Sequence, residues 1–399
     1  MKTSPYDQIP DDWNIEFLKD VCVPSGIQTG PFGSLLHQKD YISSGTPIIT
    51  VEHLGENRIL HEDLPSVTDD DRKRLSRYVM QKGDIIFSRV GSVDRRSLVR
   101  DEEDGWLFSG RCLRVRPDPK KIKPEYLSWF FGLEIFKDYI RRIAVGATMP
   151  SLNTDLLSNV PIIVPSLPEQ QAIADVLGAL DDKIELNRRM SATLESMARA
   201  VFRHWFVEGE EVKAWEVGKL GDDFNLTMGQ SPPGETYNEE GIDIPFFQGR
   251  ADFGFRFPTN RIYCTAPTRF AKEGDTLVSV RAPVGDINMA AEKCAIGRGV
   301  AAVRHKTGSR SYTYYTMKFL QDDFARFEAE GTVFGSINKN DFQSLEIFIP
   351  PVDVVKEFEE VCFPIDQMIE NNEKESRTLA SLRDGLLPRI MSGEVMVHS

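Results

Sequence analysis

Two arginines follow short apolar segments in matching stretches of the sequence. Arg89 lies in KGDIIFSRVGSVDR and Arg281 lies in EGDTLVSVRAPVGD, and each stretch runs from a Gly-Asp turn through an apolar strand into a polar loop. A guanidinium held at the end of a strand can donate two parallel hydrogen bonds to a guanine edge or to a phosphate. The alternative is a surface salt bridge to a neighbouring acid. We expect the two arginines to occupy the same place in a repeated unit and to be candidate DNA contacts.

Further polar side chains lie in loops of the same two stretches of chain. The loop at Gly30–Ser34 can offer backbone N–H groups to phosphate oxygens, although most such Gly/Pro loops are only turns. GATMPSLN and GTVFGSIN are polar loops whose side chains either bind a ligand or cap the next helix, and both alternatives stay open. The candidate DNA-binding set is Gly33, Ser34, Ser88, Arg89, Ser92, Arg95, Arg111, Thr148, Ser151, Asn153, Gln230, Ser231, Ser279, Arg281, Arg298, Thr332, Ser336 and Asn338.

The sequence offers no credible catalytic constellation and no metal spacing. The NPPY-like tetrapeptide of an amino-directed DNA methyltransferase is missing, since the nearest match is SPPG at Ser231, and no P-loop occurs. Asp118, Asp181 and Lys183 only superficially resemble a nuclease set, because the last two fall on a long helix. The six histidines are dispersed. We expect neither catalytic residues, nor a bound metal, nor a cofactor in this chain.

The net charge of the chain is −13, but the charged residues are unevenly distributed along it. The segment 72–100 carries nine basic residues against two acidic ones, whereas the segments 169–211 and 351–394 are acidic. Basic charge therefore concentrates in the globular parts, where it suits an anionic ligand, and the acidic helices are expected to face protein. No apolar signal core opens the chain, so we expect a cytoplasmic protein. Five scattered cysteines without a CxxC pair indicate reduced, partly buried thiols.

The stretch Pro168–Phe206 is predicted to form a long helix, one of the elements that must position these loops. Its apolar residues recur every 3.5 residues on average, which is typical of a coiled coil, and about 39 residues in a helix would span roughly 58 Å. The same seam returns 185 positions later, and the offset also relates loops and strands upstream, such as Asn153 to Asn338. The chain is therefore predicted to be a tandem duplication of a globular unit followed by a long helix.

Asn187 and Asn372 occupy the same position of the two helical seams. A buried Asn lowers the stability of a coiled coil but selects its register, because only one alignment satisfies the amide. Exposure of both side chains is the alternative. We interpret the pair as register-setting residues.

Within each unit the pattern predicts strands alternating with an amphipathic helix. We expect strands at 46–54 and 243–253, and one helix at 124–144 whose Trp129, Phe130 and Phe136 belong to the core. Pro364 and Pro388 interrupt the second long helix and predict that it is bent or shortened.

These motifs resemble the specificity (S) subunits of type I restriction–modification systems. The resemblance rests on PSLPEQQAIADVLGALDDKIELNRRMSATLESMARAVFRHWF, on the lead-ins GATMPSLN and VPIIVP, and on the repeat ending in SLRDGLLPRIMSGEV, and it covers essentially the whole chain. It implies two target-recognition domains of mixed α/β type in tandem, separated by two long helices that pair as an antiparallel coiled coil. Each domain would read one half of a bipartite, asymmetric DNA site, and the helices would set the spacing between the halves.

The resemblance also implies partners that carry the chemistry. Two modification subunits would bring S-adenosylmethionine and flip an adenine for N6 methylation, and restriction subunits with ATP and Mg can join them. The implied organisation is target-recognition domain 1 at 1–160, a central spacer helix at 161–208, target-recognition domain 2 at 209–348 and a C-terminal spacer helix at 349–399. Two alternatives remain open at this point: the recognition half of a divergent methyltransferase or nuclease, and a coiled-coil adaptor that binds only protein.

Overall fold

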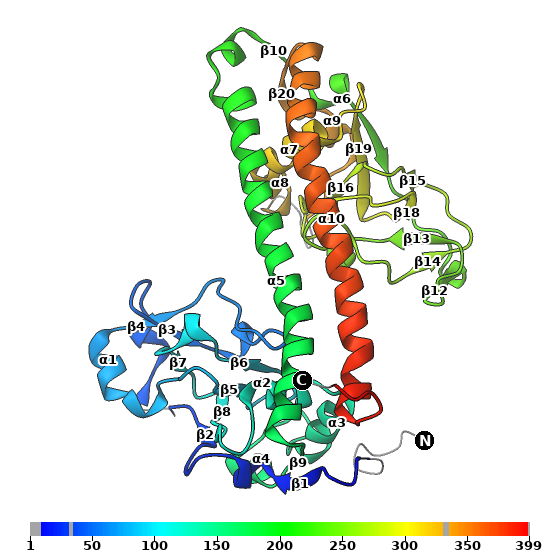
Figure 1. Ribbon diagram of the computed structural model, residues 1–399. Helices are drawn as coiled ribbons and strands as arrows, with labels where there is room; N and C mark the ends of the chain where they lie inside the picture. The colour runs from blue at the N-terminus through cyan, green and yellow to red at the C-terminus, as the bar shows by residue number, and fades with distance from the viewer. Residues whose placement is uncertain (1–8, 32–34, 330–334, 398–399) are drawn as a thin grey trace. The chain divides into compact units, whose positions relative to one another are not determined.

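The computed structural model describes residues 9–31, 35–329 and 335–397, and the chain divides into two compact units (Figure 1). The first unit comprises Met1–Ile184 with Thr378–Ser399, and the second comprises Glu185–Arg377. Two long helices, α5 (Leu167–Arg203, 37 residues) and α10 (Val352–Met391, 40 residues), each contribute to both units. Each unit is therefore a globular body packed on one portion of each helix.

The described residues of the first unit form three sheets. The four-stranded sheet has the order β2-β8-β5-β6 and is antiparallel, the three-stranded sheet has the order β4-β3-β7 with a parallel β3–β7 pair, and β1 pairs antiparallel with β9. Its strands are β1 (Asn14–Phe17), β2 (Gln28–Thr29), β3 (Thr46–Ile49), β4 (Ser66–Val67), β5 (Ile85–Ser88), β6 (Arg96–Leu98), β7 (Leu107–Phe108), β8 (Cys112–Val115) and β9 (Pro161–Val164). Its short helices are α1 (Asp69–Arg74), α2 (Pro124–Phe130), α3 (Glu134–Ile143) and α4 (Thr154–Ser158).

The second unit repeats this topology with a larger second sheet. Its sheets have the orders β11-β19-β16-β17 and β12-β14-β13-β18-β15, with a parallel β13–β18 pair, and β10 pairs antiparallel with β20. Its strands are β10 (Glu216–Lys219), β11 (Phe224–Met228), β12 (Tyr237–Asn238), β13 (Ile244–Phe247), β14 (Tyr263–Cys264), β15 (Phe270–Ala271), β16 (Thr276–Ser279), β17 (Ile287–Met289), β18 (Cys294–Ile296), β19 (Val300–His305) and β20 (Glu346–Ile349). Its short helices are α6 (Leu220–Asp223), α7 (Arg310–Phe319), α8 (Gln321–Ala329) and α9 (Lys339–Gln343). The predicted duplication is confirmed at the level of strand order and helix order.

A Gly-Asp turn precedes the central strand of each four-stranded sheet, as the sequence predicts. Gly83 and Gly274 have positive φ values of 87° and 79°, which favour glycine. The carboxylate that follows closes the turn and binds an arginine: Asp84 accepts two hydrogen bonds of 2.7 Å from Arg116, which directly follows the neighbouring strand β8. In the second unit Arg304 of β19 binds Asp275, with its Nε and Nη2 both directed to the same oxygen, Oδ1. The strand after each turn is fully buried, and its end fixes where the next loop begins.

The predicted helix at 124–144 is wrong in one respect, because it is two helices with a break at 131–133. A Cβ on Gly132 would lie 2.5 Å from Nη2 of the buried Arg96, so the chain approaches that side chain closely at the break. Glycine also has a low helix propensity. The aromatic side chains Trp129, Phe130 and Phe136 are at most 4% exposed and belong to the first unit's core, as expected.

Two further boundary predictions differ from the structure. The strand expected at 46–54 ends at Ile49, because the side chain and N–H of Thr50 bond to His53 and start a 3-10 turn at 51–53. Its counterpart expected at 243–253 is β13, which ends at Phe247. Pro364 and Pro388 do not shorten α10, which is continuous over 40 residues. Each proline removes one N–H from the helical ladder, but buried residues on the same helix, such as Cys362 and Ile390, keep it packed.

The cysteines and the helices give two simple results. All five cysteines are buried and free, and burial raises the thiol pKa of Cys22 and of Cys112 to about 12, so these groups stay protonated at neutral pH. Among the described residues, no helix combines the length and the apolar character that crossing a membrane requires.

Candidate nucleic-acid interface

In the first unit, four loops meet at the end of strand β5, and we call them loop cluster 1. They are Gly30–Pro31, Arg89–Arg95, Ser109–Arg111 and Val145–Asn153. The Arg89 backbone holds three of them together, since its N–H donates to the Arg111 carbonyl at 2.8 Å and its carbonyl accepts from Leu152 at 2.9 Å. The backbone of Gly30 packs directly against the Ser109 loop, and only glycine fits there, because a Cβ at this position would lie 2.0 Å from the Ser109 carbonyl oxygen.

In the second unit, the equivalent loops meet at the end of strand β16 and form loop cluster 2. They are Gly229–Ser231, Val280–Asp286, Gly297–Gly299 and Gly335–Asn338. The backbone of Val280 makes the same two bonds that Arg89 makes: its N–H donates to Gly299 at 2.9 Å and its carbonyl accepts from Ile337 at 3.1 Å. Gly229 is the counterpart of Gly30, with a Cβ position 2.1 Å from the Gly297 carbonyl oxygen.

These bonds correct the expected equivalence of Arg89 and Arg281 by one residue. Val280 occupies the place of Arg89, and Arg281 occupies the place of Val90, as the bridges Val90–Ser151 and Arg281–Ser336 also show. Successive residues of an extended segment face opposite sides, so the two guanidinium groups leave their loops in different directions. The Nη1 of Arg89 donates to the Gly110 carbonyl at 3.0 Å, whereas Arg281 is exposed.

The expected equivalence of Arg111 and Arg298 fails for the same reason. The turn bonds Cys112 N–H to Ser109 and Val300 N–H to Gly297 align Arg298 with Gly110, and Gly299 with Arg111. No side chain fits at Gly299, because a Cβ there would lie 2.2 Å from the Gln248 carbonyl oxygen. Both arginines are exposed, and Arg298 also contacts the Ser231 hydroxyl at 3.4 Å from its Nε. The two clusters therefore present basic charge from different backbone positions.

Several candidate side chains hold the loops in place. The buried hydroxyls of Ser88 and Ser279 donate to the carbonyls of Val90 and Pro283 at 2.9 and 2.8 Å. Asn153 and Asn338 cap α4 and α9 by accepting N–H bonds of 2.8 and 3.0 Å, which is the capping alternative that the sequence left open. The hydroxyl of Ser151 donates to Val145 at 3.1 Å.

The remaining candidates divide by exposure. Arg95 is half-buried, and its Nη2 donates to the Leu54 carbonyl. Ser92, Thr148, Gln230 and Ser336 are exposed, and Ser231 is half-buried. Gly33, Ser34 and Thr332 lie outside the described residues.

The two seam asparagines lie in the second unit and contact the opposite helix. Asn187 is 1% exposed, and its Nδ2 donates to Glu375 at 2.8 Å, to Ser376 at 3.3 Å and to the Asn372 carbonyl at 3.4 Å. The half-buried Asn372 donates from Nδ2 to the Ser191 hydroxyl at 3.3 Å. This portion of the helix pair therefore has a polar layer within its packed face.

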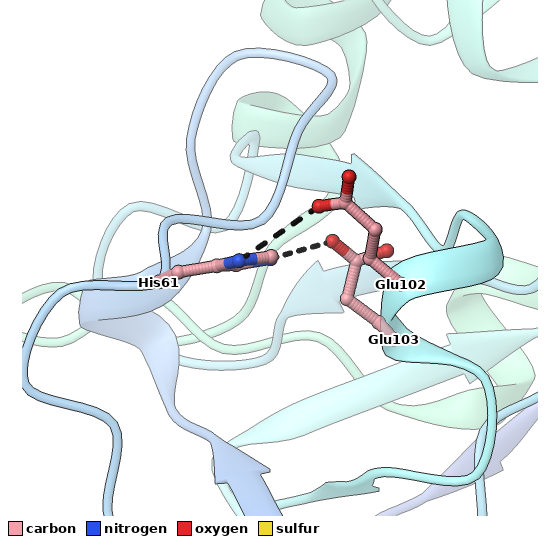
Figure 2. A group of neighbouring side chains, drawn as sticks. All are labelled: His61, Glu102 and Glu103. Atoms are coloured by element: carbon pink, nitrogen blue, oxygen red, sulfur yellow. Dashed lines mark hydrogen bonds and ion pairs between the residues drawn. The ribbon is translucent and has the colours of Figure 1, made fainter. Parts of the chain in front are cut away.

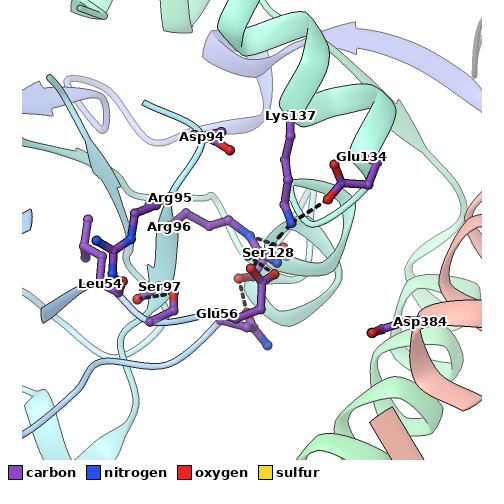
Figure 3. Close-up of polar contacts among 12 residues, drawn as sticks. Leu54, Glu56, Asp94, Arg95, Arg96, Ser97, Ser128, Glu134, Lys137 and Asp384 are labelled. Atoms are coloured by element: carbon purple, nitrogen blue, oxygen red, sulfur yellow. Dashed lines mark hydrogen bonds and ion pairs between the residues drawn. The ribbon is translucent and has the colours of Figure 1, made fainter. Parts of the chain in front are cut away.

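A group of residues that sequence reasoning missed fixes the loop Leu54–Leu60 of the first unit. Figure 3 shows Glu56 of this loop meeting Arg96, which also donates from Nε to the Ser128 carbonyl at 3.2 Å. Lys137 lies 3.5 Å from Glu56. Burial alone would raise the pKa of Glu56, but the Arg96 and Lys137 cations hold it below its usual value, so the carboxylate stays ionised.

The same loop binds α5 through Arg58. Its Nε lies 2.9 Å from Asp181 and its Nη2 lies 2.5 Å from Asp182. Asp181 is 4% exposed, and its other oxygen accepts a bond of 2.8 Å from Arg383 of α10. Within the first unit, Asp181 thus joins a loop of the globular body to both long helices.

In the second unit, Arg256 makes an equivalent three-way contact. Its guanidinium is fully buried, with Nη1 at 2.6 Å from Asp366 of α10 and Nη2 at 3.2 Å from Glu195 of α5. The guanidinium carbon lies 3.9 Å from the centre of the Tyr314 ring, which adds a cation–π contact. The 185-residue offset relates Asp181 to Asp366 and could have revealed the pair, but the arginines lie in loops of different length and do not share that offset.

One group of side chains has the residue types of a metal site. Figure 2 shows His61 facing Glu102 and Glu103, and the ligand atoms of the three lie within 4.8 Å of one another. The Nε2 of His61 bonds to Glu103 at 2.7 Å, while Glu102 lies 4.0 Å from the other ring nitrogen. Because the two carboxylates approach different nitrogens of one ring, hydrogen bonding between the imidazole and Glu103 accounts for the arrangement.

Comparison with known proteins identifies a family whose members this chain matches. Residues 10–196 and 212–380 match the family described as "Type I restriction modification DNA specificity domain". The chain is 30% identical to a putative type I restriction enzyme MjaX specificity subunit of Methanocaldococcus jannaschii, over 100% of this chain and 97% of that one. It is 25% identical to the MjaIX specificity subunit of the same organism, over 100% and 96%. The fold is that of the crystal structure of a type I restriction–modification S subunit from M. genitalium, with a TM-score of 0.59 at 18% identity and 96% coverage of both chains.

Proposed function

This chain belongs to the type I restriction–modification DNA specificity family, and we propose that each of its two target-recognition domains reads one half of a bipartite, asymmetric DNA site. The chain is the non-catalytic DNA specificity subunit of such a system. The observation that carries the proposal is the repeated loop cluster, which brings polar and basic side chains to the same end of the four-stranded sheet in both units. We assign the two domains to 1–160 and 209–348.

The exposed side chains of the two loop clusters are the proposed DNA contacts. Arg111 in the first domain and Arg281 and Arg298 in the second can bind guanine edges or phosphates through two hydrogen bonds. Ser92, Thr148, Gln230 and Ser336 add neutral donors and acceptors beside them. Because these arginines leave inequivalent backbone positions, the two domains would read different half-sites, as an asymmetric target requires.

The helical segments 161–208 and 349–399 are proposed to set the spacing between the half-sites and to dock two modification subunits. Asn187 and Asn372 would fix the register of the pair, because their Nδ2 groups reach acceptors on the opposite helix in only one alignment. The modification subunits would supply S-adenosylmethionine, and restriction subunits with ATP and Mg would join the same assembly in the cytoplasm. The acidic character of the helices supports a protein-facing role.

Methylome sequencing tests the proposal. A host that expresses this chain with its modification subunit should gain a split N6-methyladenine motif that a host without the chain lacks. Assembly of the complex without any new motif would contradict the proposal.

Two rearranged chains separate the parts of the proposal. Replacement of residues 1–150 by the matching part of another family member should change one half-site only. Insertion of one heptad into the segment 168–206 should lengthen the unread spacer and leave both half-sites unchanged. Altered half-site bases after the insertion would show that the helices do not act as a ruler.

A further inference from the structure

Each unit ties a loop of its globular body to an aspartate at the same position of a long helix. Arg58 binds Asp181 of α5, and Arg256 binds Asp366 of α10, and the two aspartates are 185 residues apart. Both arginines lie in the loop that follows the first strand of the parallel pair, β3 in the first unit and β13 in the second. We call the contacts around Asp181 junction 1 and those around Arg256 junction 2.

Junction 2 is fixed from three sides by short contacts. The Arg256 guanidinium binds Asp366 and Glu195, and the hydroxyl of Tyr315 donates to Asp366 at 2.8 Å. The backbone N–H of Arg256 donates to Glu373 of α10 at 3.0 Å. Both the side chain and the backbone of the loop are therefore attached to the helix pair.

Junction 1 achieves the same attachment with more cations. Arg58 and Arg383 approach opposite oxygens of Asp181 at 2.9 and 2.8 Å, and Arg100 lies 3.5 Å from it. Glu56, two residues before Arg58, is bound by Arg96 and Lys137 (Figure 3). The loop is thus attached to the globular body at one residue and to the helices at another.

Among the described residues, the four-stranded sheet of each unit shares a hydrophobic cluster with both long helices, whereas the second sheet does not. In the described part of the chain, the clusters around this sheet in the first unit, which include Ile49, Phe108 and Val67, contain no residue of α5 or α10. The corresponding clusters in the second unit, which include Phe246 and Phe247, contain none either. Apolar packing has no preferred direction, whereas a two-point contact between a guanidinium and carboxylates fixes an angle.

We infer that the junctions are positioning sites, which fix the angle of the second sheet of each recognition domain on the helices and thereby make the protein selective for one spacer length. The inference rests on the proposed function, since it concerns how the two half-sites are held in register. Arg58, Arg256, Asp181 and Asp366 would touch no base. They would determine how far the second sheet can tilt together with the cluster loops that leave it, Ser109–Arg111 after β7 and Gly297–Gly299 after β18, and hence whether a target with one base pair more or less is accepted.

The test uses the assembled methyltransferase on a plasmid library in which the spacer is varied by one and two base pairs. Asp366→Asn keeps the size of the side chain and Arg58→Gln keeps an N–H donor, and each removes one charge from its junction. Each substitution should lower the preference for the cognate spacer over its neighbours by roughly tenfold, which corresponds to the free energy of about one charge-assisted hydrogen bond. Both half-sites should stay unchanged. Arg58→Lys should restore part of the preference, because a lysine provides the charge but not the two-point geometry.

Arg326→Gln is the matched control. Its guanidinium is 75% exposed and pairs with Asp323 at 2.9 Å, away from either junction, so spacer preference should stay at the wild-type level. Equal losses of methylation at all spacers in both junction variants would show that the junctions only stabilise the fold, and would overturn the inference alone. A wild-type complex without any split motif would instead overturn the proposed function, and the inference with it.

Discussion

Both junctions attach a loop of the globular body to the long helices, but the residue at the centre of each carries the opposite charge. In the second unit one cation, Arg256, lies between the acids Glu195 and Asp366 and is fully buried. In the first unit one acid, Asp181, lies among the cations Arg58, Arg100 and Arg383, whose side chains are 15–32% exposed. The repeat has kept the aspartate position on the helix but not the set of partners.

This difference teaches which parts of a duplicated ionic contact can diverge. A helix position is fixed by the seam on both sides of it, so the aspartate stays in place, while loops of different length deliver the arginine. The burial of the central charged residue then decides how much folding stability is lost when that residue is replaced. A charge left without its partner destabilises the fold most where water cannot reach it. The comparison therefore predicts unequal responses to equivalent substitutions.

The largest effect is expected for Arg256→Met. The substitution leaves Glu195 and Asp366 without their buried cation and should destabilise the second unit by about 3–5 kcal/mol. Hydrogen exchange of the full chain should show faster exchange in peptides of residues 185–377, with the first unit unchanged. Arg326→Met, which removes an exposed guanidinium from the same unit, is the control and should change exchange very little. Unchanged protection in Arg256→Met would show that the buried contact is replaceable.

A smaller effect is expected for Asp181→Asn. The single amide oxygen can still accept from Arg58 or from Arg383, but the side chain no longer balances three guanidinium groups, and both burial and the neighbouring Arg58 cation already lower the pKa of Arg100. We expect a loss of roughly 1–3 kcal/mol in the first unit, because the cations reach solvent. Combining Asp181→Asn with Arg58→Gln should cost less than the sum of the two single changes, since both remove the same contact. Additive losses in chemical denaturation would place the two residues in separate contacts.

Much of the architecture follows from the sequence because periodicity reports packing. The 3.5-residue seam and its return after 185 positions predicted both long helices, and the Gly-Asp turns predicted the strands β5 and β16 that end at the loop clusters. The helix break at Gly132 was missed because it depends on the approach of Arg96 from another strand. Such a tertiary contact leaves no local trace in the pattern.

The loop clusters show where sequence matching reaches its limit. A shared Ser-Arg-Gly character suggested that Arg89 and Arg281 are equivalent, yet one extra residue places Val280 at the position of Arg89. Because side chains alternate along an extended segment, an error of one residue reverses the face on which a side chain lies. Junctions 1 and 2 were missed for a related reason, since Arg58 and Arg256 come from loops that a fixed offset does not align.

A still smaller effect of the opposite sign is expected for Asn187→Leu. The Oδ1 of Asn187 is buried and accepts no hydrogen bond within the described residues, so an apolar side chain should raise the stability of the second unit by about 1 kcal/mol. The cost should appear as weaker spacer preference in the methylation library, because the helix pair loses its register. Asn372→Leu is the matched variant and should act less strongly, since Asn372 is only half-buried. A loss of stability in Asn187→Leu would identify the asparagine as a necessary donor to Glu375 instead.

The smallest effect concerns Glu373, which supports junction 2 by accepting the Arg256 N–H at 3.0 Å. Burial raises the pKa of Glu373 above that of an exposed glutamate, whereas the Arg96 and Lys137 cations lower the pKa of Glu56 in the first unit despite its burial. A carboxyl whose pKa is raised by folding destabilises the folded state at neutral pH, and this penalty disappears as the pH falls through the raised pKa. For Glu56 the sign is reversed: its contribution is present at neutral pH and is lost as the pH falls through the lowered pKa.

Glu373→Gln should therefore stabilise the second unit at pH 7–8, because the amide oxygen still accepts the Arg256 N–H without carrying a buried charge. We expect a gain below about 1 kcal/mol, or roughly 2–4 °C in the unfolding temperature, that shrinks as the pH approaches 5. Glu56→Gln should destabilise the first unit by a nearly constant amount over this pH range, since a carboxyl whose pKa is lowered keeps its charge throughout it. Thermal unfolding of both variants from pH 5 to pH 8 measures the two opposite signs. A destabilising Glu373→Gln at pH 8 would mean that its charge is balanced by Arg256 and Arg377, and the carboxylate would then be a further ionic member of junction 2.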